Sequence, residues 1–177
     1  MYRDNTLIPT EAIRLAALGS LVEGDKLYAD LASEIRYFVA RVAGPSLDLL
    51  GTSLELLSYE ELAVSADGGG VRDGALLQIT ENGREAFHTL MTSNVRAPVN
   101  DVSKLVIALK MRFMHLLPAE DLSEQAEMLS EMCEVELVRL KDLRGGYKQE
   151  PLAQWLDLEI AQLQERLDWF NTLGAES

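Results

Sequence analysis

Apolar residues in the first 60 positions recur every three or four residues, the spacing of one face of an α-helix. Three such stretches follow one another, over residues 12–22, 26–43 and 46–60. Thr10 precedes the first stretch and Asp25 precedes the second, and both side chains are good N-caps. Gly44-Pro45 separates the second stretch from the third, because proline cannot continue a helix. The pattern therefore predicts three consecutive helices.

The spacing of apolar residues changes after residue 61. Residues 62–66 and 75–79 are short strand-like runs, and the eight residues between them include four glycines. Such a segment favours a flexible hairpin loop. Thr80 is placed to cap a further helix over residues 81–92. Three helices, a hairpin and a helix are the elements of a winged helix-turn-helix, in chain order.

Residues 93–100 have the composition of a linker, and every later segment is helical. Apolar stripes run through residues 101–117, from 121 or 123 to 144, and through 152–170, where the spacing approaches a heptad repeat. An apolar seam in each of three helices is more than a small domain needs, which indicates pairing with a second copy. We therefore expect a mostly α-helical chain. Its domains are a winged helix-turn-helix over 1–93, with three helices plus a β-hairpin wing, and a C-terminal helical dimerisation domain over 94–177.

The side chains expected at the dimer interface are Leu105, Leu109, Phe113, Leu152, Trp155, Leu156, Ile160, Leu163, Leu167 and Phe170. A second interpretation concerns the sulfur-containing and indole side chains of the same helices. Together they could line a space for a small apolar effector. The residues in question are Met111, Met114, Met128, Met132, Trp155 and Trp169. Dimer core is the preferred interpretation.

Composition narrows the classes of function. Hydrophobic residues make up 47% of the chain, enough for a packed core. Sixteen basic against 29 acidic residues give a net charge of −13, which counts against broad nucleic-acid or anionic-membrane binding. Cys133 is the single cysteine, so no intrachain disulfide forms, and a reducing compartment fits. With no long apolar run, we expect neither signal peptide nor membrane span, and a cytoplasmic location.

Catalytic chemistry is not indicated. The chain has two histidines, His88 and His115, and no spacing that forms a Ser-His-Asp grouping or a His-x-x-x-His metal pair. Gly68-Gly69-Gly70 lacks the Lys and the Ser or Thr that follow in a phosphate-binding loop. We therefore expect no enzyme, no metal site and no cofactor.

Three segments resemble the PadR-type transcriptional regulators. Ile79-Thr80-Glu81-Asn82-Gly83-Arg84-Glu85 is similar to the Leu-Thr-x-x-Gly-Arg-Glu motif that begins the helix after the wing in this family. Residues 105–118, ending in Leu116-Leu117-Pro118, are similar to the first helix of its C-terminal domain, and the region around Trp169 to the last. The resemblance implies a winged helix joined to a helical dimerisation domain, and a homodimer that binds operator DNA.

The segment in the place of the recognition helix departs from the family pattern. Leu54 and Leu57 keep the expected leucine pair. Gly51 stands where the family has a tyrosine, Glu55 and Leu56 stand where it has basic residues, and Glu61 replaces the glycine before the wing. No Lys or Arg lies between Val42 and Val71.

Two functions therefore stay open. The first is a PadR-like regulator that binds DNA through helix 46–60 and the wing 67–74. The side chains expected to reach phosphates or bases are Arg36, Arg41, Ser46, Thr52, Ser53 and Arg72. The second is a non-enzymatic module on a winged-helix scaffold that has lost DNA binding and contacts a protein partner. Positions 1–93 hold seven basic and fourteen acidic residues. The sign of the electrostatic potential over the third helix and the wing is therefore the feature that distinguishes the two functions.

Overall fold

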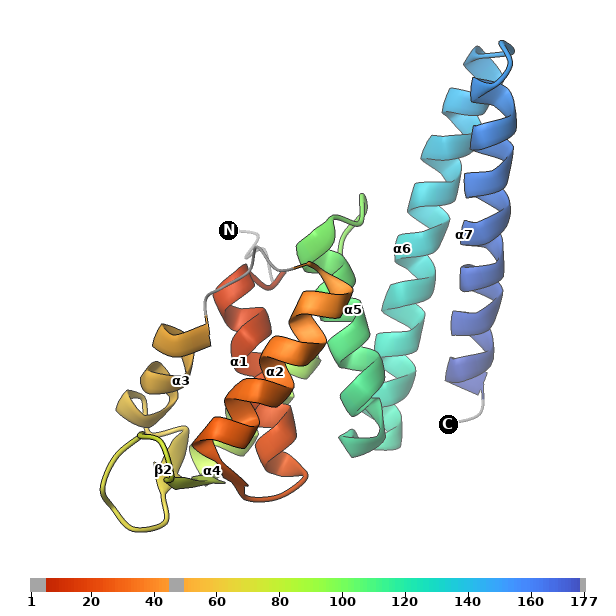
Figure 1. The fold of residues 1–177 in the computed structure, drawn as a ribbon. Helices are drawn as coiled ribbons and strands as arrows, with labels where there is room; N and C mark the ends of the chain where they lie inside the picture. Colours follow the sequence, from red (N-terminus) through yellow and green to blue (C-terminus); the bar gives the residue numbers. More distant parts are fainter. Residues whose placement is uncertain (1–5, 45–49, 176–177) are drawn as a thin grey trace, which may run out of the picture. The chain divides into compact units, whose positions relative to one another are not determined.

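The computed structural model describes residues 6–44 and 50–175, without the side chains of residues 50–52. Two compact units make up the chain (Figure 1). Unit 1 comprises residues 1–94 and 99–115, and unit 2 comprises residues 95–98 and 116–177. The mostly helical fold that the sequence predicts is confirmed, with one small antiparallel sheet in unit 1.

The first two predicted helices are confirmed as α1 (Pro9–Val22) and α2 (Tyr28–Val42), but neither predicted cap is used. Thr10 lies inside α1, because Pro9 occupies the first turn and the Glu11 carboxylate accepts from the Ile8 N–H at 2.9 Å. Asp25 accepts from the Gln78 side-chain amide at 2.6 Å instead of capping α2. The third helix is α3 (Leu50–Tyr59), and the predicted start at 46–49 lies outside the described residues.

The sheet has one strand more than the sequence predicted. β2 (Ala63–Ser65) and β3 (Leu76–Ile79) form the expected hairpin. β1 (Lys26–Leu27) adds to the other edge of β3 and gives the antiparallel order β1-β3-β2. Two residues are too few to show an alternating pattern, so this strand has no signature in the sequence.

The predicted cap of the helix after the wing is confirmed. α4 (Glu81–Met91) begins at Thr80, whose hydroxyl accepts from the Gly83 N–H at 3.0 Å and donates to the Glu61 carbonyl at 2.7 Å. Gly83 packs directly on the Leu62 backbone, where a Cβ would stand 2.0 Å from the carbonyl oxygen. The family-like motif around Thr80 therefore fastens α4 to the turn after α3.

Helix α5 (Asp101–Phe113) differs from the expectation, because it packs on α1 and α2 as part of unit 1. Phe113 meets Phe87 of α4 edge-on, with ring centroids 6.1 Å apart. Leu105, Leu109 and Phe113, expected at the dimer interface, are fully buried. Helical periodicity shows that one face is covered but not what covers it, which is why this assignment failed.

Unit 2 is a hairpin of two long helices, α6 (Ala119–Gly146) and α7 (Leu152–Ala175). α6 continues through Gly145 and Gly146, where the sequence predicted a break. At the turn, the Arg144 guanidinium holds both carboxylate oxygens of Asp157, at 2.7 and 3.0 Å. Such bidentate pairs are geometrically specific and fix the start of α7 against the end of α6.

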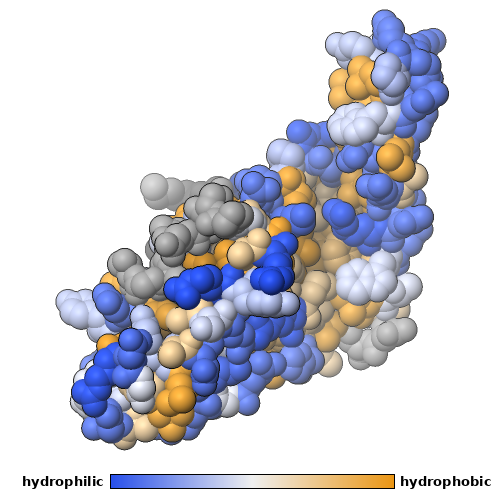
Figure 2. All heavy atoms as spheres, in the orientation of Figure 1, coloured by the Kyte–Doolittle hydropathy of each residue, from blue (hydrophilic) through white to orange (hydrophobic). Residues whose placement is uncertain are grey.

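Most of the predicted apolar seam of α7 packs against α6 within this hairpin. Leu156, Leu163, Leu167 and Phe170 are buried, whereas Leu152 and Trp155 are exposed and Ile160 is intermediate. Apolar atoms remain on the surface of the hairpin (Figure 2). The exposed large apolar residues of α6 and α7 are Val135, Val138, Leu143, Leu152, Trp155, Leu158 and Trp169. None of the helices in residues 6–44 and 50–175 combines the length and the apolar character needed to cross a bilayer.

Candidate nucleic-acid interface

α3 is held in place by its leucine pair and presents acidic and apolar side chains outward. Leu54 and Leu57 are buried, while Glu55, Leu56 and Tyr59 are exposed, Tyr59 by 84%. Ser53, expected to contact DNA, is only 6% exposed and faces the core. Ser46 lies outside the described residues, as does the side chain of Thr52.

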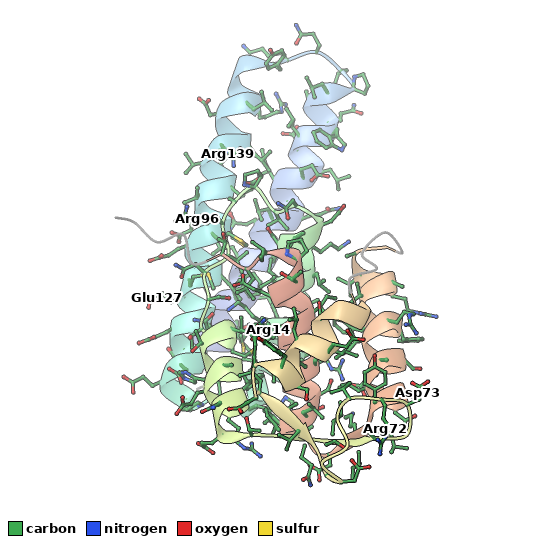
Figure 3. All side chains as sticks on the ribbon, turned by 90° about the vertical axis from the view of Figure 1, so that its left-hand side faces the viewer. Arg14, Arg72, Asp73, Arg96, Glu127 and Arg139 are labelled. Carbon is green, nitrogen blue, oxygen red and sulfur yellow. The ribbon has the colours of Figure 1, made fainter. Side chains whose placement is uncertain are left out.

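The end of α3 carries a strained residue. Arg14 of α1 pairs with Glu60 at 2.9 Å and ties the two helices together, and Figure 3 shows Arg14 beside α3. Glu61 follows with φ of 57°, the left-handed conformation that favours glycine. The resemblance to PadR-type regulators predicted a glycine here, and the backbone at Glu61 has the conformation that glycine favours.

The wing loop is closed by contacts around one carboxylate. Asp67 accepts from the Ser65 hydroxyl, from the Gly69 N–H at 2.8 Å and from the Arg72 guanidinium at 2.7 Å. The hydrogen bond from Ser65, then that from Gly69 and the nearby cation, hold the pKa of Asp67 below its ordinary value. Arg72, labelled in Figure 3, is exposed to solvent. Its guanidinium is nevertheless paired with Asp67 of the same loop.

α2 presents a cation over an aromatic ring. The Arg41 guanidinium lies 3.5 Å from the centre of the Tyr37 ring and donates to the Tyr37 carbonyl at 3.3 Å. Tyr37 is 61% exposed, and Arg36 beside it in the chain is exposed as well. Sequence reasoning selected Arg36 and Arg41 but missed Tyr37, although its spacing of four residues from Arg41 was the available signal.

A half-buried polar cluster fixes α2 in unit 1. Glu34 accepts from Lys26 at 2.6 Å, from the Ser20 hydroxyl at 2.7 Å and from Arg112 of α5. Burial alone would raise the pKa of Glu34, but the hydrogen bonds from Lys26, Ser20 and Arg112 outweigh it and lower the pKa to about 2. The carboxylate therefore stays ionised and joins α2 to α1, β1 and α5.

The two indole side chains that could line a space for an apolar effector lie on the surface of unit 2. Trp155 and Trp169 are about half exposed, at 53% and 51%. A cavity of about 400 Å³ in the hairpin is polar and anionic instead. Its lining residues are Ser123, Glu127, Ser130, Glu131, Glu134, Phe170, Asn171 and Gly174. Across residues 6–44 and 50–175, no three His, Cys, Asp or Glu side chains gather as metal ligands would.

A winged helix followed by long helices is an architecture of transcriptional regulators. The model of the family described as "Putative AphA-like transcriptional regulator" matches residues 2–174, and the chain belongs to this family. No curated protein matches the chain.

Three solved structures of Bacillus subtilis PadR are similar to the chain. The crystal structure of that protein is 15% identical with a TM-score of 0.42, covering 97% of each chain. Its complex with operator DNA is 15% identical with a TM-score of 0.39, covering 92% of this chain and 97% of that one. Its complex with p-coumaric acid is 18% identical with a TM-score of 0.40, covering 97% and 98%.

Proposed function

We propose that the protein regulates transcription by binding operator DNA as a homodimer, through α3 and the loop between β2 and β3. The observation that carries the proposal is that α3 and this loop lie next to each other on one side of unit 1 (Figures 1 and 3). A winged helix inserts its third helix into the major groove and lays its wing beside it. Membership of a transcriptional-regulator family supports the same function.

The charge of the protein sets the strength expected of this binding. Each phosphate that a cation neutralises contributes about 0.9 to the slope of log K against log salt. A chain with net charge −13 and no cation among the described residues of α3 offers few such contacts. Binding is therefore weak, needs low salt and has a shallow salt slope.

The test is a binding titration of the full chain with duplex DNA from upstream of its own gene, at two salt concentrations. A random duplex of equal length is the control. The proposal expects tighter binding to the upstream fragment, with affinity falling at the higher salt. Absence of binding to either duplex at low salt would contradict it.

The second function, a protein-interaction module, is favoured by the exposed face of α3. Glu55 repels phosphate, whereas Leu56 and Tyr59 offer apolar surface that suits a protein partner. Substituting Glu55→Lys and Glu61→Lys replaces this repulsion by attraction. If the wild type binds no duplex and the double variant binds DNA of any sequence, the module interpretation is the correct one.

A further inference from the structure

Four cations of unit 1 are already neutralised by a carboxylate. The arginine and lysine side chains paired with a carboxylate are Arg14, Lys26, Arg72 and Arg112. A pair of opposite charges at contact distance attracts a phosphate little, because the two contributions nearly cancel. The exposed cations of unit 1 without a carboxylate partner in the described chain are Arg36, Arg41, Arg84 and Lys104.

Two of these four belong to one helix of the helix-turn-helix. Arg36 and Arg41 are five residues apart on α2, a rise of about 7.5 Å along the axis. Neither arginine has a carboxylate three or four residues away on α2. By contrast, the exposed Arg84 is followed directly by Glu85 and lies on α4, and Lys104 lies on α5.

Tyr37 prepares one of these arginines for a ligand. Its ring lies 3.5 Å under the Arg41 guanidinium, and its carbonyl accepts a hydrogen bond from the same group. The contact holds the guanidinium of Arg41 in one orientation. Less side-chain entropy is therefore lost when this guanidinium binds a phosphate. Guanidinium donors remain for a phosphate, and the exposed phenol hydroxyl adds a further donor.

We infer that Arg36, Tyr37 and Arg41 on α2 form the main phosphate-contacting surface of this protein for duplex DNA, with Tyr37 as the positioning residue for Arg41. The inference rests on the proposed function and assigns its electrostatic part to α2 rather than to α3 or the wing. α2 contacts α3 within unit 1, so a duplex that meets α3 passes beside α2 (Figure 1).

The experiment measures affinity for the upstream duplex and for a random duplex across a series of salt concentrations. Arg36→Gln and Arg41→Gln should each weaken binding to both duplexes several-fold. Each should lower the salt slope by about 0.9 for every subunit on the DNA. Arg84→Gln is the matched control, since it removes from α4 an exposed arginine with no carboxylate partner in the described part of the chain, and it should leave the slope unchanged.

Variants of Tyr37 test its positioning role. Tyr37→Leu should weaken binding while keeping the salt slope, because no charge is removed. Tyr37→Phe keeps the ring under Arg41 and should restore most of the lost affinity. All four sites are exposed, so each variant should unfold at the same temperature as the wild type.

The outcomes separate the inference from the function on which it rests. If the wild type binds DNA but Arg36→Gln and Arg41→Gln keep its slope, or Arg84→Gln lowers the slope equally, the inference is wrong and the proposed function stands. If the wild type binds no duplex at low salt, both are wrong. In that case, a protein that binds to the face formed by Arg36, Tyr37 and Arg41 would be the partner of the protein-interaction module.

Discussion

The ring of Phe113 lies directly against the backbone of Gly19. A Cβ placed on residue 19 would stand 2.5 Å from Cε2 of the ring, closer than packed carbon atoms approach. The bare backbone of α1 thus admits the last side chain of α5 into the core of unit 1. This contact explains why α5 belongs to the winged-helix unit, although it lies beyond the linker in the sequence.

Gly19→Ala should therefore destabilise unit 1. We expect a loss of about 1–3 kcal/mol in the free energy of unfolding, because the aromatic ring must move out of a packed core. Chemical denaturation followed by circular dichroism measures the effect. Gly145→Ala is the control, because it meets open space in α6 and should be neutral or slightly stabilising.

Glu61→Gly should stabilise the protein by about 1 kcal/mol. Glu61 is held at φ of 57°, where a side chain costs about 1–2 kcal/mol and glycine is unstrained. Glu55→Gly is the matched control, since the same change inside α3 should cost about 1 kcal/mol. A loss of stability in Glu61→Gly would show that contacts of the glutamate side chain outweigh the strain.

The Glu34 cluster should govern stability in acid. The folded pKa of Glu34, about 2, lies below its unfolded value of 4.5, so its contribution is complete above pH 4.5 and disappears as the pH falls through 2. Glu34→Gln should lower stability at pH 7 by roughly 2 kcal/mol after allowance for solvent screening. The variant should also lose less of its free energy of unfolding than the wild type as the pH falls from 4.5 to 2. Glu85→Gln, at an exposed site on α4, should leave both features as they are in the wild type.

Lys110 should make stability rise with pH at alkaline values, the same direction of pH dependence that Glu34 gives in acid. Its buried ammonium donates to the carbonyls of Met91 and Ser93, and burial lowers its pKa to about 7. The unfolded chain keeps this proton up to about pH 10.4, so the contribution of Lys110 to stability rises with pH between 7 and 10.4.

The test compares wild type and Lys110→Met over that range of pH. The variant should lack this rise, which amounts to at most about 1.4 kcal/mol per pH unit. The difference between the two slopes isolates Lys110 from the other groups that titrate there. Parallel curves for the two proteins would show that the ammonium keeps its proton in the fold.

A dimer, if formed by the hairpin, should use its exposed apolar face. On α7 this face holds Trp155, Leu158 and Trp169, which lie on one side of the helix by their spacing. Trp155→Asp combined with Leu158→Asp should convert a dimer into monomers in sedimentation at micromolar concentration. Ala161→Asp, exposed elsewhere on α7, is the control.

Substitutions in the core of the hairpin distinguish loss of the dimer from unfolding of the hairpin. Leu156 and Leu163 are buried under α6, so replacing them by Asp should remove helical signal rather than split a dimer. A wild type that sediments as a monomer at micromolar concentration would contradict the homodimer itself.

Local features of the fold were predictable from the sequence because their causes lie within a few residues. The stripes of α1, α2 and α7, the β2–β3 hairpin and the Thr80 cap depend on spacing and on adjacent side chains. The absence of Lys and Arg from residues 43–70 is likewise visible in the sequence.

What covers each apolar face, and which charges remain free, was decided only by the tertiary structure. Periodicity marks a buried face equally whether its partner is in the same unit, in the next helix or in another copy of the chain. It therefore could not tell that α5 packs on α1, or that the α7 seam packs on α6. Similarly, Arg14–Glu60 and Arg112–Glu34 join residues 46 and 78 positions apart. Only folding brings such charges together, and among residues 6–44 and 50–175 it leaves Arg36 and Arg41 without a carboxylate partner.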